Sequence, residues 1–150
     1  MKSPRCTVIL PTYNRAARLP RAVTSVITQN EPDFELIIIN DNSTDNTRTW
    51  LETLDDPRIR VVHLEYNQGP SAARNVGINL ATAPVLAFLD SDDVYREGRL
   101  SVPLAVLDRE PDVICTLSSA LKEYKRGDKA VARLPDVKLA SSAFEWAMSN

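Results

Sequence analysis

Short runs of apolar, β-branched residues alternate with helical patterns along most of this 150-residue chain. Consecutive Val, Ile and Leu residues are typical of strands that are buried on both faces of a sheet. Strands separated by helices predict a parallel sheet with right-handed crossovers. The expected fold class is α/β, a mostly parallel open sheet with helices on both faces. The expected strands are CTVIL (6–10), FELIII (34–39), RVVHL (60–64), VLAFL (85–89) and DVICTL (112–117).

Four helices are expected between these strands. Apolar residues at helical spacing, capping residue types and Gly-Pro breaks mark where they begin. They are a stripe from Leu19 to Ile27 with Pro20 in its first turn, a helix capped near Ser43 to Asp45, and segments that follow Gly69-Pro70 and Gly98.

Composition narrows the class of protein. With 43% hydrophobic and 25% charged residues and no linker, the chain is expected to form one domain over residues 1–150. A net charge of -2 gives no positive field that would attract the backbone of a nucleic acid, so nucleic-acid binding is not expected. No apolar run approaches the ~20 residues that cross a bilayer, and no secretory signal is recognised. Cys6 and Cys115 are interpreted as buried free thiols of a cytoplasmic protein.

Common nucleotide and hydrolase motifs are absent from the sequence. The four glycines, at 69, 77, 98 and 127, form neither the dinucleotide fingerprint nor the phosphate loop. A serine-nucleophile elbow, G-x-S-x-G, is also missing. The single histidine, His63, cannot make a histidine-based zinc site and is interpreted as a buried or edge-strand residue.

Polar and acidic residues follow the expected strands. In open α/β sheets the ligand lies beyond the carboxyl ends of the strands. If the fourth strand stays extended through Asp92, Asp90 and Asp92 lie on one side, where Mg²⁺ or Mn²⁺ suits their oxygens. A solvated acidic loop is the alternative interpretation. The four strand-end segments are PTYN (11–14), NDNSTD (40–45), EYNQGPSAARN (65–75) and DSDD (90–93).

Four stretches in order carry a family resemblance, from about residue 6 to about residue 100. They are TVILPTYNRAARLPRAVTSVITQ, FELIIINDNSTDNT, NQGPSAARNVGI and VLAFLDSDDVY. Together they resemble the nucleotide-sugar-dependent glycosyltransferases of the GT-A fold, in particular the inverting enzymes of family 2. The resemblance implies a Rossmann-like nucleotide-binding half with a D-x-D metal motif.

The resemblance also implies roles for individual residues. The loop Pro11-Thr12-Tyr13-Asn14 is similar to the one that wraps the nucleotide base, with Tyr13 stacking on it. Asp41 stands where the family has the carboxylate that accepts the N–H of the base, which favours UDP. Asn40 stands where the family often has Asp.

The diphosphate side of the implied site lies in the later motifs. Arg74 is expected either to contact phosphate or to hold the acidic loop. Asp90 and Ser91 are expected on the nucleotide, and Asp92, with Asp90, on the metal, Mn²⁺ or Mg²⁺.

The implied activity is transfer of a sugar from a nucleoside diphosphate to a saccharide, lipid or other hydroxyl acceptor, with inversion. Inversion requires a general base opposite the leaving group, and none is recognised in this chain. KEYKRGDKAVAR (122–133) is interpreted as a hairpin and SSAFEWAM (141–148) as a short helix.

The chain therefore resembles the donor-binding part of an enzyme without its acceptor-binding part. It is expected in the cytoplasm, including the cytoplasmic face of the membrane. Two alternatives are a non-catalytic nucleotide-sugar binding module and an α/β interaction domain. The sequence specifies neither the sugar, nor the acceptor, nor the oligomeric state.

Overall fold

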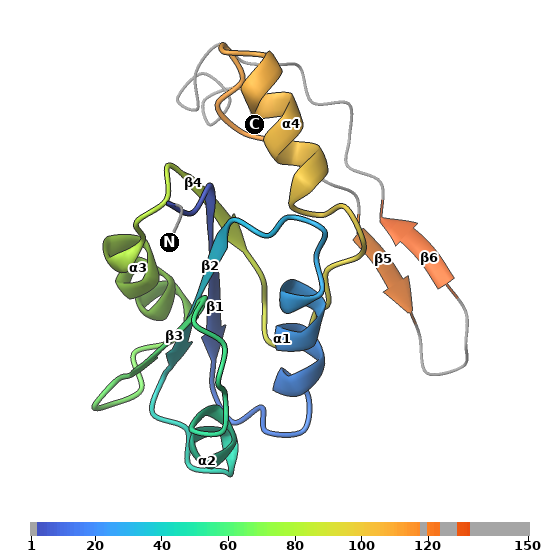
Figure 1. Cartoon of the computed structure of the whole chain (residues 1–150). Helices are drawn as coiled ribbons and strands as arrows, with labels where there is room; N and C mark the ends of the chain where they lie inside the picture. Colours follow the sequence, from blue (N-terminus) through green and yellow to red (C-terminus); the bar gives the residue numbers. More distant parts are fainter. Residues whose placement is uncertain (1–2, 118–119, 124–128, 133–150) are drawn as a thin grey trace. The chain divides into compact units, whose positions relative to one another are not determined.

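The computed structural model describes residues 3–117, 120–123 and 129–132 (Figure 1). The chain divides into two compact units, residues 1–101 and 102–150. The first unit contains a four-stranded parallel sheet with strand order β3-β2-β1-β4, which confirms the expected fold class. Its strands are β1 (Cys6–Thr12), β2 (Phe34–Asn40), β3 (Ile59–His63) and β4 (Val85–Phe88).

The two central strands form the core of the sheet. Every residue of β1 is buried, and in β2 only Glu35 is partly exposed. Burial on both faces explains why these runs are apolar at consecutive positions rather than at alternate ones. Thr12 pairs with Asn40 in the parallel register, so β1 and β2 end at the same level. The segments that follow them therefore start side by side.

Helices cover both faces of this sheet, with α1 (Leu19–Ile27) and α3 (Pro70–Leu80) on opposite sides (Figure 1). The buried stripe of α1 is Leu19, Ala22, Val23 and Val26, as its spacing predicts. Gly77 of α3 approaches the sheet so closely that a Cβ there would lie 2.5 Å from Ile9 Cγ2. The short helix α2 (Thr47–Leu51) follows β2.

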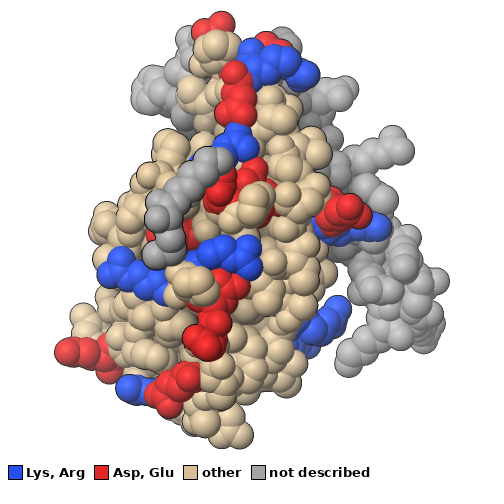
Figure 2. Space-filling model, in the orientation of Figure 1, with Lys and Arg blue, Asp and Glu red and all other residues tan. Residues whose placement is uncertain are grey.

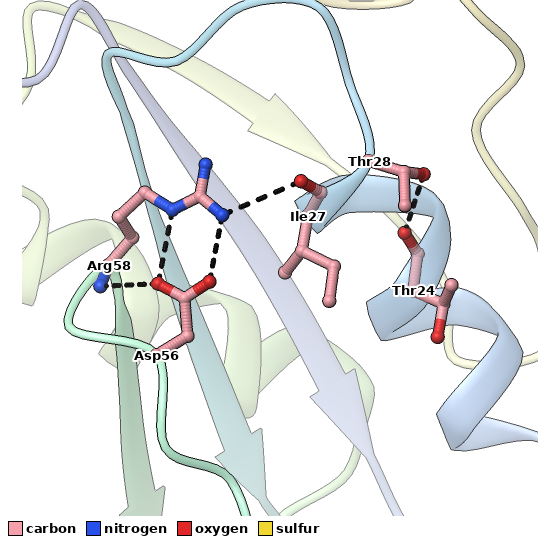
Figure 3. Close-up of polar contacts among 5 residues, drawn as sticks. All are labelled: Thr24, Ile27, Thr28, Asp56 and Arg58. Carbon is pink, nitrogen blue, oxygen red and sulfur yellow. Dashed lines mark hydrogen bonds and ion pairs between the residues drawn. The ribbon is translucent and has the colours of Figure 1, made fainter.

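An ion pair joins three elements at the amino end of the sheet (Figure 3). Arg58, just before β3, donates from Nη2 to Asp56 Oδ2 at 2.8 Å and to the Ile27 carbonyl at the end of α1 at 3.5 Å. The Arg58 guanidinium also lies over the Phe34 ring, 4.4 Å from its centroid. Its hydrogen bond holds the pKa of Asp56 below the ordinary value. These contacts connect the start of β3 with the end of α1 and the start of β2.

The second unit corrects one expected strand. Residues 112–117 form no regular element, and Ile114 and Leu117 are more than half exposed. Cys115 is also exposed, against the expectation of a buried thiol, whereas Cys6 is buried as expected. An apolar, β-branched run becomes a strand only where a neighbouring strand accepts its hydrogen bonds, and none pairs with it in the described part of the chain.

The remaining elements agree with the sequence where they are described. Helix α4 (Ser101–Arg109) follows Gly98, and β5 (Ala120–Glu123) pairs antiparallel with β6 (Lys129–Ala132), as expected for a hairpin. The helix expected over 141–148 lies outside the described residues. Within the described ranges, no helix is both long and apolar enough to cross a membrane. Figure 2 shows Lys and Arg interspersed with Asp and Glu on the face in view.

Candidate functional site

Four strand-end and loop segments of the first unit meet around one cleft at the carboxyl edge of the sheet. The cleft has a volume of about 540 Å³. Every residue that the sequence predicted for the site lines it. Its lining consists of Pro11, Thr12, Tyr13, Asn14, Arg15, Asp41, Asn67, Gly69, Pro70, Ala73, Arg74, Asp90, Ser91 and Asp92.

The loop after β1 places an aromatic ring and a buried hydroxyl at the cleft. Tyr13 is 45% exposed, so one part of its ring is free for a ligand. Thr12 is buried, and its Oγ1 has no hydrogen-bond partner among the described residues. A buried hydroxyl without a partner is unfavourable unless a ligand or water pairs with it.

Asn14 connects this loop to the segment that follows β2. Its Oδ1 accepts hydrogen bonds from the backbone N–H groups of Thr44 at 2.7 Å and Asp45 at 3.3 Å. Its own N–H donates to Ser43 Oγ at 2.9 Å. Asn14 therefore lies at the cleft, but its side-chain oxygen, Oδ1, is already hydrogen-bonded within the protein.

Asp41 is buried and binds the start of α3 through both carboxylate oxygens. Oδ1 accepts from the Gln68 N–H and Oδ2 from the Gly69 N–H, each at 2.8 Å. Asn67 Nδ2 donates to the Asp41 carbonyl at 3.2 Å. Gly69 has a φ of +85°, a conformation that side-chain-bearing residues rarely adopt. Asp41 thus fixes the turn that forms one wall of the cleft.

Asn40, which is buried, pairs with the partly exposed His63 at the ends of β2 and β3. Asn40 Nδ2 donates to His63 Nδ1 at 2.9 Å, and Asn40 Oδ1 accepts from the Ser43 N–H at 3.1 Å. Burial lowers the pKa of His63, and the charge of Arg48 lowers it further, which favours neutral imidazole protonated on Nε2. His63 ends the edge strand β3, in agreement with its sequence-based interpretation.

The acidic segment after β4 is a turn, which corrects the extended geometry expected from the sequence. The strand ends at Phe88, and the Asp93 N–H donates to the Asp90 carbonyl at 3.0 Å. Alternation along a strand therefore does not bring Asp90 and Asp92 together. Both still line the cleft, and Ser91 between them is buried.

Arginine side chains neutralise these carboxylates. Arg74 of α3 donates through Nη2 to Asp90 Oδ1. Asp92 Oδ2 lies 3.7 Å from Arg15 Nη2 and 3.8 Å from Arg18 Nη1. The sequence left two roles open for Arg74, contact with phosphate or support of the acidic loop. In this structure its side chain binds Asp90 of that loop. Arg15 and Arg18 were missed, although their position just after the PTYN motif was the available signal.

The chain after the acidic turn is held against α1. The Tyr95 N–H donates to Ser25 Oγ and the Tyr95 hydroxyl to the Phe88 carbonyl, both at 2.9 Å. Burial raises the pKa of Tyr95, so its hydroxyl stays protonated and remains a donor. Gln29 adds bonds to the Arg96 carbonyl and the Leu100 N–H. The acidic turn is therefore anchored at both ends.

Two carboxylates, those of Asp90 and Asp92, line the cleft and are the side chains that could hold a cation there. No group of three or more His, Cys, Asp or Glu side chains gathers as a metal site within the described ranges. Two carboxylates fit Mg²⁺ or Mn²⁺, because these ions keep several positions for water and phosphate oxygens. The site's own donors thus suit a cation that arrives with a phosphorylated ligand.

Relatives of known sequence match two thirds or more of this chain. Succinoglycan biosynthesis protein ExoO of Rhizobium meliloti (strain 1021) is 32% identical over 146 residues, which cover 92% of this chain and 41% of ExoO. The UDP-Glc:alpha-D-GlcNAc-diphosphoundecaprenol beta-1,3-glucosyltransferase WfgD of Escherichia coli is 33% identical over 101 residues, covering 67% of this chain and 40% of WfgD. The chain spans less than half the length of either relative.

Solved structures share its fold. S. aureus TarS in complex with UDP-GlcNAc matches with a TM-score of 0.68 and 31% identity, covering 73% of this chain and 32% of that one. The mannosyltransferase PcManGT of Pyrobaculum calidifontis, in complex with GDP-Man and Mn²⁺, matches with a TM-score of 0.62 and 30% identity. The match covers 75% of this chain and 34% of PcManGT.

A sequence-family model gives the assignment. The model described as glycosyl transferase family 2 matches residues 7–143, which include every residue that lines the cleft. The parallel sheet agrees with GT-A-type structural neighbours. The chain belongs to glycosyl transferase family 2 and has the GT-A fold.

Proposed function

We propose that the chain is the donor-binding part of an enzyme that moves a sugar from a nucleoside diphosphate to an acceptor hydroxyl with inversion. One observation carries the proposal: the exposed ring of Tyr13, the buried carboxylate of Asp41 and the acidic pair Asp90 and Asp92 line a single cleft. These groups match the aromatic, polar and charged parts of a metal-bound nucleoside diphosphate. The family assignment supports the same chemistry.

Recognition of the base is assigned to Tyr13, Thr12 and Asp41. The Tyr13 ring offers a face for stacking, and the unpartnered Thr12 hydroxyl offers a donor and an acceptor. Each Asp41 oxygen accepts one backbone N–H in this structure. Since a carboxylate has about four lone-pair positions, it retains capacity for the N–H of uracil. UDP-sugars are therefore the favoured donors, and TarS, solved with UDP-GlcNAc, supports this preference.

The diphosphate is assigned to the opposite part of the cleft. Asp90 and Asp92 would hold Mn²⁺ or Mg²⁺, which neutralises charge on the departing diphosphate when bound. Arg74 is assigned to orient a phosphate oxygen, which is supported by its position in the cleft lining and by its contact with Asp90. The mannosyltransferase PcManGT, solved with GDP-Man and Mn²⁺, supports a divalent cation.

Inversion remains an expectation of the resemblance. It requires one in-line displacement and a general base on the far side of the sugar, to which no residue of this chain is assigned. A saccharide or lipid-linked hydroxyl is the proposed acceptor class, supported by WfgD, whose name specifies a diphosphoundecaprenol-linked acceptor. Such an acceptor would place the enzyme at the cytoplasmic face of a membrane.

Calorimetric titration tests the donor site. UDP and GDP are each titrated into the chain in the presence of Mn²⁺ and again in EDTA. We expect UDP to bind only with the metal and more tightly than GDP. If UDP bound equally well in EDTA, the assignment of Asp90 and Asp92 to a metal would be wrong. If GDP bound more tightly than UDP, the assignment of Asp41 to uracil would be wrong. Release of sugar from a bound UDP-sugar separates an enzyme from a non-catalytic binding module.

A further inference from the structure

Asn14 has a backbone conformation that few residue types adopt readily. Its φ is +52°, and the only other non-glycine residue with positive φ in the described ranges is Asn42, at +57°, in the facing segment. Asparagine is among the residues that tolerate this left-handed region. The conformation turns the chain sharply just after Tyr13.

This turn points three successive backbone N–H groups at the segment that follows β2. Asn14 N donates to Ser43 Oγ at 2.9 Å, Arg15 N to Thr47 Oγ1 at 3.0 Å, and Ala16 N to Asp45 Oδ2 at 3.1 Å. A regular strand could not direct consecutive N–H groups to one side, because they alternate. The contacts therefore depend on the positive φ.

The Asn14 side chain completes the connection in the reverse direction. Its Oδ1 accepts from the N–H groups of Thr44 and Asp45, so both lone pairs of that oxygen are engaged. We call this two-way set of bonds between residues 14–16 and 43–47 the Asn14 clamp. It continues the strand bond in which Asp41 N donates to the Thr12 carbonyl at 2.9 Å.

The clamp lies between the two residues assigned to the base. Tyr13 immediately precedes Asn14, and Asp41 lies at the start of the segment that Asn14 holds. We propose that Asn14 is a positioning residue for donor binding, which fixes the separation of Tyr13 and Asp41 and acts on the nucleotide through them. The inference rests on the proposed function of the cleft. It replaces the sequence-based prediction of direct nucleotide contact by Asn14.

Three variants separate the parts of the clamp. Asn14→Gly keeps the positive φ but removes the acceptor oxygen. Asn14→Asp keeps an acceptor oxygen and tolerates the same φ, and moderate salt screens its repulsion from Asp45. Thr44→Ala is the matched control, because it removes an exposed hydroxyl 3.4 Å from Asn14 Oδ1 but leaves the Thr44 N–H in place.

The expected result is a selective loss on the nucleotide side. In calorimetry with Mn²⁺, Asn14→Gly should lower the affinity for UDP about tenfold, whereas Asn14→Asp and Thr44→Ala should stay within about threefold of the parent chain. Affinity for Mn²⁺ with inorganic pyrophosphate, which has no base, should not change in Asn14→Gly. A parallel loss of pyrophosphate affinity would overturn the positioning role.

A double-mutant cycle distinguishes positioning from contact. In a Tyr13→Ala background, Asn14→Gly should cost less than tenfold, because one of the two side chains through which it acts is already gone. Fully additive losses would mean that Asn14 does not act through Tyr13, and the proposal would fail.

Hydrogen exchange tests the clamp without any ligand. Asn14→Gly should speed exchange of the Thr44 and Asp45 amides, and Asn14→Asp should not. If the parent chain bound no UDP but this exchange pattern appeared, the nucleotide assignment would fall and the clamp would stand. Unchanged exchange in Asn14→Gly would overturn the clamp itself. Should Asn14→Gly not fold, Ser43→Ala, which removes only the Asn14 N–H acceptor, should give a smaller change in the same direction.

Discussion

The two sides of the cleft are built by different interactions. The hydrogen-bonded side comprises residues 12–16, 40–47 and 67–69, apart from the side chain of Arg15, and there backbone N–H groups donate to side-chain oxygens, of which those of Asp41 belong to a buried residue. The charged side comprises the side chains of Arg15, Arg18, Arg74, Asp90 and Asp92, which form exposed ion pairs. One side is fixed before any ligand arrives, and the other has charges that a ligand can rearrange.

This difference matches what each side is proposed to bind. Reading a flat base requires fixed donors and acceptors, because a displaced carboxylate loses the hydrogen bond that discriminates. Holding a cation and a diphosphate requires charges that can exchange partners. Exposed ion pairs contribute little to stability, so their exchange costs little. The comparison predicts large stability effects on the hydrogen-bonded side and ligand- or salt-dependent effects on the charged side.

The largest expected effect is that of Asp41→Asn. The new amide has one acceptor oxygen, so its NH₂ group faces one of the two backbone N–H groups that Asp41 now binds. We expect the free energy of unfolding to fall by about 2 kcal/mol. Urea denaturation followed by circular dichroism measures it. Asp90→Asn, at an exposed side chain, is the control and should change stability by less than about 1 kcal/mol. Equal losses would contradict the comparison.

On the charged side, Asp92→Ala should act on ligand affinity and not on folding. Removing an exposed carboxylate should change stability by no more than about 0.5 kcal/mol. The affinity for UDP in Mn²⁺ should fall at least about tenfold, or about 1.4 kcal/mol. Asp93→Ala, which removes a neighbouring acid outside the cleft lining, is the matched control and should retain most of the affinity. Undiminished UDP affinity in Asp92→Ala would show that this carboxylate is not a metal ligand.

The sheet and the position of the cleft could be predicted from the sequence. The sheet was predictable because strands buried on both faces must be apolar at consecutive positions, as β1 and β2 are. The same criterion was wrong for 112–117, since an apolar run contains no information about whether a partner strand lies beside it. The parallel topology then placed Tyr13, Asp41, Arg74 and Asp90 at one edge, where the structure has them.

The contacts within the site were less predictable. Asp41 binds the backbone N–H groups of Gln68 and Gly69, and every residue except proline offers such a group, so no side-chain pattern marks the pair. The Asn14 clamp depends on a positive φ that sequence favours only weakly. The pairing of Asp92 with Arg15 and Arg18 depends on a turn after Phe88, where alternation along an extended strand was expected.

A smaller effect is expected for Arg74→Met, through its dependence on salt. The variant removes the ion pair with Asp90, and at low salt it should lower the free energy of unfolding by less than about 1 kcal/mol. Near 1 M NaCl, where the screening length is about 3 Å, the difference should disappear. The loss in Asp41→Asn should persist there, because it arises from buried hydrogen bonds. If Arg74→Met lowered the free energy of unfolding equally at low and high salt, Arg74 would belong to the hydrogen-bonded side of the cleft.

The smallest effect is a dependence on pH that has opposite sign at Asp93, which adjoins the charged side, and at Asp45, on the hydrogen-bonded side. Burial and the charges of Asp92 and Asp90 raise the pKa of Asp93. Its ionised form is therefore disfavoured in the folded state, and this penalty disappears as the pH falls through the folded pKa. Asp93→Asn should raise the melting temperature slightly at pH 7, and the gain should vanish on acidification.

Asp45, on the hydrogen-bonded side, should behave in the opposite way. Slight burial raises its pKa, but hydrogen bonds from Thr47 and Ala16 outweigh this and lower the pKa below the ordinary value. Its stabilisation is therefore present above the unfolded-state pKa and is lost as the pH falls through the folded one. Asp45→Asn should lower the melting temperature at pH 7 but not in acid. Melting curves of both variants from pH 7 into acid test the contrast. A lower melting temperature of Asp93→Asn at pH 7 would contradict it, because the acidic turn would then be stabilised by the Asp93 charge that its neighbours disfavour.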